Sequence, residues 1–304
     1  LNAAALLGEI TVRENTSAMS KSEMVESLVN YDIVLPTLGD IYSEEVFDLC
    51  EEIRTKLLAN FGAGFSHINV DAASSNGIKV TNTPGAVTDA TADIAMALML
   101  MCCRRTSEGE RLVRLGKWEG WHPTQMLGFH ISDKTVGIVG MGNIGQAIAE
   151  RCHFGFGMQI GYFSRSPKIL KYSAKQYSSL GELASNCDIL VVAVPGGAAT
   201  HHLIDKKVFA AMQSHAYFVN IARGDIVKET DLIKALKSKE IAGAGLDVYD
   251  IEPLPQDHKL RFLPNALLTP HIGYVTAENY SIYYTQMIEA LEACVNGKPI
   301  RVIE

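Results

Sequence analysis

Short apolar runs alternate with longer helical patterns along most of the 304-residue chain. Most of the runs are apolar at nearly every position, which is typical of strands covered on both faces of a parallel sheet. The alternation of runs and helical stretches predicts sheets wound by right-handed βαβ crossovers. The predicted strands lie at residues 33–36, 56–60, 79–81, 135–139, 158–163, 189–194, 217–221, 244–248 and 266–268.

The helical patterns suggest how the chain is divided. One long apolar helix separates an N-terminal α/β segment from a central one, and a second long helix lies near the end of the sequence. A chain of this length is expected to form two domains. The predicted helices lie at residues 89–114, 143–153, 179–186, 229–238 and 277–295.

Composition and charge narrow the functional classes. The formal net charge of −7 argues against a nucleic-acid partner, because binding a polyphosphate needs a basic face. No apolar run reaches the roughly 20 residues that a membrane span requires, so no membrane partner is expected. The six cysteines have no C-x-x-C spacing, and no residue cluster has metal-ligand spacing. We therefore expect no metal, and free thiols in a reducing cytoplasm.

A G-x-G-x-x-G motif at Gly140, Gly142 and Gly145 follows an apolar strand and opens a helix. The first glycine permits a tight turn, the second lets the backbone approach a pyrophosphate, and the third lets helix and strand pack closely. The helix start at Asn143 and Ile144 then offers free amides and a favourable dipole to the anion. A glycine-rich turn without a ligand is the alternative, but the flanking strand and helix favour a dinucleotide site.

The end of the next strand bears on cofactor choice. An NAD site usually places Asp or Glu there to bind the ribose 2′-hydroxyl, whereas this chain has Ser164, Arg165 and Ser166. A hydroxyl and a guanidinium suit a 2′-phosphate, which a carboxylate would repel. NADP(H) is therefore favoured. NAD(H) is the alternative cofactor if Arg165 is an ordinary exposed residue that stacks on adenine.

Three polar residues, Arg223, Glu252 and His271, follow predicted strands, and ligands gather at the carboxyl ends of parallel strands. An arginine can bind a carboxylate and polarise a carbonyl, while an imidazolium supplies a proton to a reduced keto group. A carboxylate beside the histidine orients the ring and favours its charged form. Each residue alone could be a cap, a loop acid or a structural histidine, but the three in order favour catalysis.

From about residue 60 to its end, the chain resembles the D-isomer-specific 2-hydroxyacid dehydrogenases, which include glyoxylate/hydroxypyruvate reductases, D-lactate dehydrogenases and phosphoglycerate dehydrogenases. The resemblance rests on the glycine motif, the three catalytic segments and residues 60–65, 80–85 and 88–93. It implies an α/β fold of two doubly wound parallel-sheet domains. A Rossmann-type cofactor domain is expected at 85–273 and a flavodoxin-like substrate domain at 1–84, with 274–304 returning to it. It also implies a homodimer joined through the cofactor domains.

The resemblance also assigns roles. It makes Arg223 the substrate-binding arginine, His271 the proton donor and Glu252 the residue that tunes His271. The backbone of Ala63 and Gly64 is expected to hold the substrate carboxylate. Ser164, Arg165 and Ser166 resemble the NADP-preferring glyoxylate/hydroxypyruvate branch, so we expect reduction of a small 2-keto acid to the D-2-hydroxy acid. Asp247 is expected to contact the nicotinamide amide, and the other expected cofactor contacts are Thr83, Pro195, Ile221, Ala222 and Gly273.

The sequence departs from the family pattern at three places. Tyr274 stands where a small residue usually follows the His-Ile-Gly segment, and it could narrow the pocket or reach the cofactor. Gly196 and Gly197 replace the apolar residue and threonine that commonly follow Val194-Pro195, which loosens that wall. The first strand of the substrate domain is expected to precede Leu1. None of these departures removes a catalytic group.

Three alternative functions stay open. A formate-dehydrogenase-like enzyme is disfavoured because that branch resembles this chain except for a glutamine where Glu252 stands. A phosphoglycerate dehydrogenase is a second candidate within the family. A redox-sensing corepressor of the same fold could keep all three catalytic residues, so only turnover or partner binding would distinguish it, although the acidic charge argues against it.

Overall fold

The structure is a computed structural model that describes residues 2–303. The chain divides into two compact units: unit 1 comprises Leu1–Val87 and Val275–Glu304, and unit 2 comprises Thr88–Tyr274. Each unit is built around a parallel sheet, which confirms the predicted α/β class. Within residues 2–303, no helix is both long and apolar enough to cross a membrane.

Unit 2 contains a seven-stranded parallel sheet with the order β10-β9-β8-β7-β4-β5-β6. Its strands are β4 (Thr135–Val139), β5 (Gln159–Phe163), β6 (Ala174–Gln176), β7 (Ile189–Val192), β8 (Tyr217–Asn220), β9 (Gly243–Leu246) and β10 (Ala266–Leu268). The strand order reverses between β4 and β7, which is the topological switch point of a Rossmann-type sheet. Dinucleotides bind at the carboxyl ends of the strands beside such a point.

Both faces of this sheet are buried, which explains the uniformly apolar strands. In β7, Ile189 and Val191 enter the core beneath α4 and α6, whereas Leu190 and Val192 enter the core beneath α7, α8 and α9. A strand that feeds two cores cannot alternate apolar and polar positions. The helices of unit 2 are α4 (Thr88–Arg104), α5 (Thr106–Arg114), α6 (Asn143–Phe156), α7 (Leu180–Ser185), α8 (Lys206–Ala211) and α9 (Glu229–Lys237).

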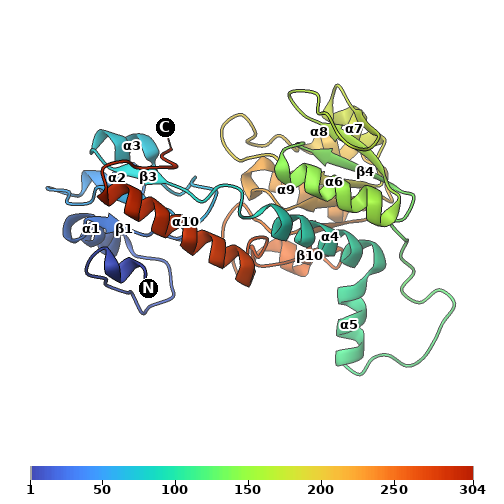
Figure 1. Cartoon of the computed structure of the whole chain (residues 1–304). Helices are drawn as coiled ribbons and strands as arrows, with labels where there is room; N and C mark the ends of the chain where they lie inside the picture. The colour runs from blue at the N-terminus through green and yellow to red at the C-terminus, as the bar shows by residue number, and fades with distance from the viewer. Residues whose placement is uncertain (1, 304) are drawn as a thin grey trace. The chain divides into compact units, whose positions relative to one another are not determined.

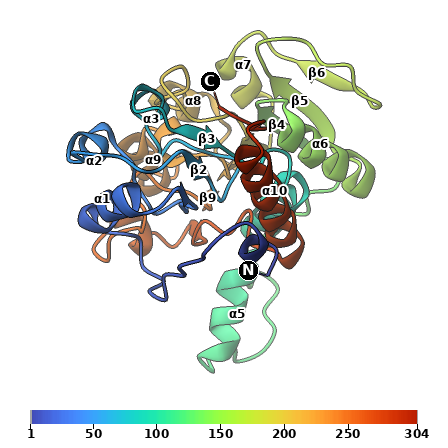
Figure 2. The same cartoon turned by 60° about the vertical axis from the view of Figure 1, so that its left-hand side comes forward.

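The prediction of one continuous helix over residues 89–114 is wrong. Arg105 has a left-handed backbone with φ of 53°, which separates α4 from α5. No residue of α5 is buried, and the helix extends away from the rest of unit 2 (Figures 1 and 2). The edge strand β6 was not predicted, because its Ala-Lys-Gln sequence lies on the surface and has no apolar pattern.

Unit 1 has a three-stranded parallel sheet, β1 (Ile33–Val34), β2 (Leu57–Ala59) and β3 (Lys79–Thr81), in sequential order. Leu58 packs into a core with α1 (Lys21–Asn30), α2 (Glu44–Asp48) and α3 (Val70–Ser75). On the other face, Leu57 and Ala59 pack against Leu291 of α10 (Ala277–Val295), which returns from the end of the chain (Figure 2). Unit 1 also has a short 3₁₀ helix, η1 (Ala4–Leu6), and unit 2 has two, η2 (Gly224–Ile226) and η3 (Lys259–Phe262).

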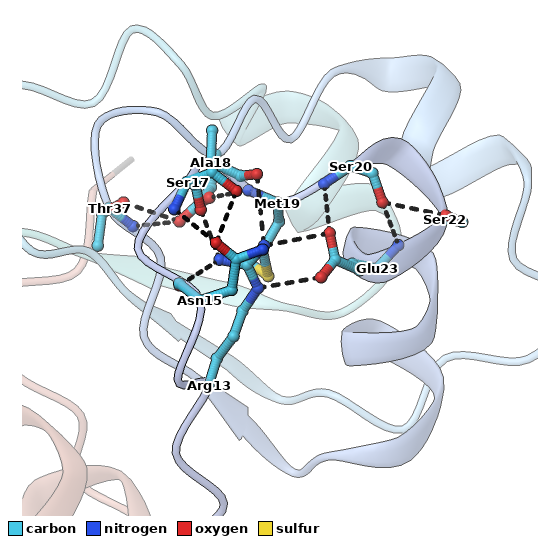
Figure 3. Close-up of polar contacts among 10 residues, drawn as sticks. Arg13, Asn15, Ser17, Ala18, Met19, Ser20, Ser22, Glu23 and Thr37 are labelled. Carbon is cyan, nitrogen blue, oxygen red and sulfur yellow. Dashed lines mark hydrogen bonds and ion pairs between the residues drawn. The ribbon is translucent and has the colours of Figure 1, made fainter.

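Polar contacts attach the segment before α1 to unit 1 (Figure 3). Arg13 donates to Glu23 at 3.0 Å, and Glu23 completes a capping box with Ser20 at the start of α1. The Arg13 hydrogen bond, followed by those from Ser20, lowers the pKa of Glu23 to about 2. The buried Asp40 accepts hydrogen bonds from Met19 and Thr37, so the turn after β1 is held to the same segment.

Candidate active site

The glycine-rich turn between β4 and α6 lies at the switch point of unit 2. Gly140 has φ of +99°, and a Cβ there would lie 2.7 Å from the carbonyl oxygen of Ala193. A Cβ on Gly145 would lie 2.0 Å from the carbonyl oxygen of Gly140, so this close packing also requires glycine. Gly142 is different, because a Cβ there would meet nothing within 4 Å. The open position in the motif is therefore the one where a ligand is expected to approach.

The start of α6 has the features of an anion site. Gly142 is the N-cap of α6 and supplies no side chain to cap its first amides. The first amides of a helix lack partners within the helix, and its dipole places partial positive charge at this end. Asn143 and Ile144 provide the first two of these amides. This turn fits the pyrophosphate of a nicotinamide dinucleotide.

The segment after β5 presents cationic and hydroxyl groups, with no carboxylate between residues 164 and 168. Ser164 is half-buried and donates from Oγ to the carbonyl oxygen of Ser166 at 2.6 Å, while Arg165 and Lys168 are exposed. Gln176 of β6 donates from Nε2 to the carbonyl oxygen of Ser164 at 3.0 Å. The unpredicted strand β6 therefore helps to fix the backbone that presents Arg165.

A histidine and a glutamate form a close pair after β9 and β10. Nδ1 of His271 lies 2.6 Å from Oε2 of Glu252, and Oε1 of Glu252 accepts from the amide of Tyr249 at 2.9 Å. The two side chains are 24% and 34% exposed, respectively. Burial opposes ionisation of Glu252, but its hydrogen bond and charge interaction with His271 outweigh burial, and the pKa of Glu252 is lowered. Nε2 of His271 makes no hydrogen bond within the described residues.

The backbone at His271 is held in an unusual conformation. His271 has φ of 52°, a left-handed geometry that costs a residue other than glycine about 1–3 kcal/mol. The buried carboxylate of Asp247 accepts from the amides of Ile272 and Gly273 at 2.9 and 2.8 Å and from Oγ1 of Thr269 at 2.6 Å. Asp247 thus holds the segments on both sides of His271. This anchoring contact was not foreseen in the sequence.

Arg223 follows β8 and is half-buried. Its carbonyl oxygen accepts from Nδ2 of the buried Asn220 at 2.9 Å, which fixes the turn. A Cβ on Gly224 would lie 1.9 Å from the backbone of Tyr249, so this glycine allows the Arg223 turn to lie against the segment leading to Glu252. The charge of Arg223 contributes to lowering the pKa of Glu252, after the His271 and Tyr249 contacts. The three predicted catalytic residues are therefore neighbours in unit 2.

Two departures from the family pattern lie beside these residues. The rings of His271 and Tyr274 meet edge to face, with centroids 6.1 Å apart and an interplanar angle of 79°. A Cβ on Gly196 would lie 3.0 Å from Cγ of Arg223, so the absence of a side chain here makes room for the aliphatic part of Arg223. Both departures therefore lie against predicted catalytic side chains.

The remaining predicted cofactor residues of unit 2 lie on the same strand ends. Ile221 and Ala222 are buried directly after β8, and Pro195 is exposed after β7. Gly273 is buried, and its carbonyl oxygen accepts from Oγ1 of Thr91 at 3.0 Å. Residues 2–303 contain no group of three or more His, Cys, Asp or Glu that could hold a metal ion.

The predicted carboxylate loop lies in unit 1, after β2. The carbonyl oxygens of Gly62 and Gly64 accept from Nδ2 of Asn60, and that of Ala63 accepts from Nδ2 of Asn82. The amides of Ala63 and Gly64 donate no hydrogen bond within the described part of the chain. Thr83, a predicted cofactor contact, also lies in unit 1, and its buried hydroxyl has no partner among those residues. Consecutive amides without partners can form an anion-binding nest.

Known proteins are similar to this chain in sequence and architecture. Residues 96–273 match the family described as "D-isomer specific 2-hydroxyacid dehydrogenase, NAD binding domain". A glyoxylate reductase of Thermococcus onnurineus is 39% identical over 274 residues, which cover 88% of this chain and 81% of that protein. The crystal structure of the TT0316 protein from Thermus thermophilus is 36% identical, with a TM-score of 0.90 and coverage of 100% of this chain and 96% of that one.

A further similar structure contains a bound nucleotide. It is an NADPH-dependent glyoxylate/hydroxypyruvate reductase from Sinorhizobium meliloti in complex with NADP and malonate. It is 30% identical, with a TM-score of 0.82, and the match covers 93% of this chain and 87% of that chain.

Proposed function

The chain belongs to the D-isomer-specific 2-hydroxyacid dehydrogenase family, and we propose that it reduces glyoxylate or a similar small 2-keto acid, such as hydroxypyruvate, to the D-2-hydroxy acid. The observation that carries this proposal is the His271–Glu252 pair beside Arg223 at the carboxyl ends of the sheet. Identity of 39% to a glyoxylate reductase supports the substrate class.

The three side chains divide the chemistry between them. Arg223 binds the substrate carboxylate and polarises the keto oxygen, because a guanidinium stabilises negative charge that develops there. His271 donates the proton to that oxygen from Nε2, while its Nδ1 stays bonded to Glu252. Glu252 orients the ring and stabilises the imidazolium. A reduced nicotinamide, when bound, supplies the hydride.

The cofactor is held mainly by unit 2 in this proposal. The turn at Gly140, Gly142 and Gly145, with the amides of Asn143 and Ile144, binds the pyrophosphate. Ser164, Arg165 and Ser166 bind the 2′-phosphate, so NADP(H) is preferred and NAD(H) is a weaker alternative. The remaining cofactor contacts are Thr83, Pro195, Ile221, Ala222, Asp247 and Gly273.

Unit 1 is proposed to be the substrate domain. The amides of Ala63 and Gly64, which donate no hydrogen bond within the described residues, can donate to an anion without a charged side chain. A 2-keto acid carries one carboxylate, for which such a pair of amides is a suitable partner. We assign this loop to the substrate carboxylate.

A homodimer is proposed from the exposed α5 region. No residue of α5 is buried, and Val113 and Leu115 are each 59% exposed. Trp118 and Trp121 follow and stack edge to face with centroids 5.4 Å apart, although Trp121 is 88% exposed. Concentrated apolar exposure of this kind marks an interaction surface, and a second copy of this chain is the proposed occupant. The free state of all six cysteines supports a reducing compartment, which we propose to be the cytoplasm.

The decisive test is a substrate screen. Oxidation of NADPH and NADH is measured with glyoxylate, hydroxypyruvate, pyruvate, phenylpyruvate and 2-ketogluconate, alongside NAD(P)-dependent oxidation of formate and 3-phosphoglycerate. We expect the highest kcat/KM with glyoxylate or hydroxypyruvate, and none in His271→Ala, which should still bind NADPH. Cofactor binding without turnover of any substrate would instead support the sensor alternative, and turnover only of formate or phosphoglycerate would reassign the enzyme.

A further inference from the structure

The carboxylate loop of unit 1 depends on a buried asparagine. Asn60 is 1% exposed and directly follows β2. Its Nδ2 lies 2.9 Å from the carbonyl oxygens of both Gly62 and Gly64. One amide group therefore engages the Gly62–Ala63 and Gly64–Phe65 peptide units, while the Ala63–Gly64 unit between them is held through its carbonyl by Nδ2 of Asn82. Because each peptide group is planar, fixing its carbonyl also fixes the direction of the following N–H.

His67 determines which way the Asn60 amide faces. Nε2 of His67 lies 2.9 Å from Oδ1 of Asn60. The carbonyls of Gly62 and Gly64 can only accept, so the amide nitrogen must face them and the amide oxygen must face His67. The histidine must then donate from Nε2. The His67 bond therefore adds to the two carbonyls in fixing the orientation of the Asn60 amide.

The rest of the loop is anchored independently of Asn60. The amide of Phe61 donates to the carbonyl oxygen of Pro36 at 2.9 Å, and the Phe61 ring contacts Tyr280, Tyr283 and Tyr284 of α10 at centroid distances of 4.8 to 5.4 Å. The fold of unit 1 thus holds the base of the loop. Nδ2 of Asn60 acts on the carbonyls of Gly62 and Gly64, the first of which also accepts from the amide of Thr83 at 3.1 Å.

We propose that Asn60 and His67 are positioning residues that shape the nest of amides at Ala63 and Gly64 for the substrate carboxylate. The inference rests on the proposed function of that loop. His67 donates to Asn60, and Asn60 holds the Gly62 carbonyl and with it the direction of the Ala63 N–H. Asn60 also holds the Gly64 carbonyl on the far side of the nest, while Asn82 holds the Ala63 carbonyl and with it the Gly64 N–H. Neither side chain needs to touch the substrate.

Three variants and one control test this chain of contacts. Asn60→Asp keeps the size of the side chain but cannot donate to the two carbonyls at neutral pH. His67→Leu removes the donor to Asn60, whereas His67→Gln retains an N–H donor. His215→Leu is the control, because it removes a histidine that hydrogen bonds to Asp188 in unit 2, away from the proposed machinery.

Steady-state kinetics with glyoxylate and NADPH give the readout. We expect Asn60→Asp and His67→Leu to raise KM for glyoxylate about 10- to 100-fold, the scale of one lost buried hydrogen bond, with KM for NADPH within about 2-fold of wild type. The inhibition constant of oxalate should rise in parallel. His67→Gln should recover most of the wild-type KM, and His215→Leu should not change it.

The outcomes separate this inference from the proposed function. If the wild-type protein does not reduce glyoxylate or hydroxypyruvate, the proposed function fails, whatever the variants do. If the wild type is active but His67→Leu has an unchanged KM for glyoxylate, or raises both KM values together, the positioning role is wrong. Equal losses in His67→Gln and His67→Leu would also overturn it. Thermal unfolding verifies folding, and the two His67 variants decide the matter if Asn60→Asp does not fold.

Discussion

Nδ1 of His271 lies 2.6 Å from Oε2 of Glu252, although the two residues are separated by a proline-containing loop and strand β10. This bond occupies one nitrogen of the ring and leaves Nε2 as the nitrogen that can exchange a proton with a substrate. The same pair lowers the pKa of Glu252 against the effect of burial, which favours the ionised carboxylate beside the ring. An ionised carboxylate at this distance favours the imidazolium.

The first prediction concerns the pH dependence of catalysis. Reduction needs protonated His271, so kcat/KM for keto-acid reduction should fall as pH rises and the ring loses its proton. Glu252→Gln removes the charge but can keep a hydrogen bond, so this falling limb should move to lower pH. The pH profiles of both proteins with one active keto acid provide the measurement. A limb at the same pH in Glu252→Gln would show that the carboxylate charge does not act on His271.

The second prediction concerns the arginine fork. Arg223→Lys keeps the positive charge but loses the planar guanidinium that can bond a carboxylate and a keto oxygen together. We expect kcat/KM to fall by about 100-fold or more, the scale of removing one preorganised charge-stabilising group. NADPH binding, measured by fluorescence titration, should change little. Near-normal turnover would assign Arg223 a structural role.

The third prediction concerns cofactor choice. Ser164→Asp combined with Arg165→Ala introduces a like charge beside the 2′-phosphate and removes the guanidinium, so the preference for NADPH should reverse toward NADH. The ratio of kcat/KM values for the two cofactors measures this directly. Gln176→Leu, which removes the support of Ser164 by β6, should weaken the NADPH preference without reversing it. A wild-type enzyme that uses NADH better would contradict this interpretation.

The fourth prediction concerns the buried carboxylate behind the histidine. Asp247→Asn replaces a charged acceptor of three hydrogen bonds with a neutral amide, so the left-handed His271 segment should lose its anchor. We expect the free energy of unfolding to fall by about 1–3 kcal/mol and kcat to fall at least about 10-fold. Urea unfolding and kinetics measure the two effects. A rise confined to KM for NADPH would instead favour direct contact with the nicotinamide as the main role of Asp247.

The fifth prediction concerns thiol reactivity. Burial raises the pKa of Cys102, Cys103, Cys152 and Cys187 to about 12, so these thiols should stay protonated and unreactive in the folded protein. At about pH 8, a thiol-specific chromogenic reagent should leave these four thiols unmodified in the native protein. After denaturation it should modify all six cysteines. Fast modification of the four buried thiols in the native protein would indicate that the sheet core opens readily.

Much of the fold was predictable because burial on both faces leaves a direct trace in the sequence. The uniformly apolar run at 189–192 reflects a strand that feeds two cores, and the helix predicted at 277–295 has the same bounds in the structure. The glycine turn was readable for a similar reason. A Cβ on Gly140 or Gly145 would collide with a neighbouring backbone carbonyl, so the local geometry requires glycine at both positions.

Tertiary structure decided the features that depend on distant partners. The sequence did not predict that the long helix breaks at Arg105 or that Gln176 lies on an edge strand that supports Ser164. It also did not predict that Asp247 anchors the backbone beside His271. Arg223, Glu252 and His271 were identified by their order along the chain, yet only folding shows which nitrogen of His271 meets Glu252. Apolar periodicity reports how each segment meets solvent, whereas a buried polar group is satisfied by whichever segment the fold brings within hydrogen-bonding distance.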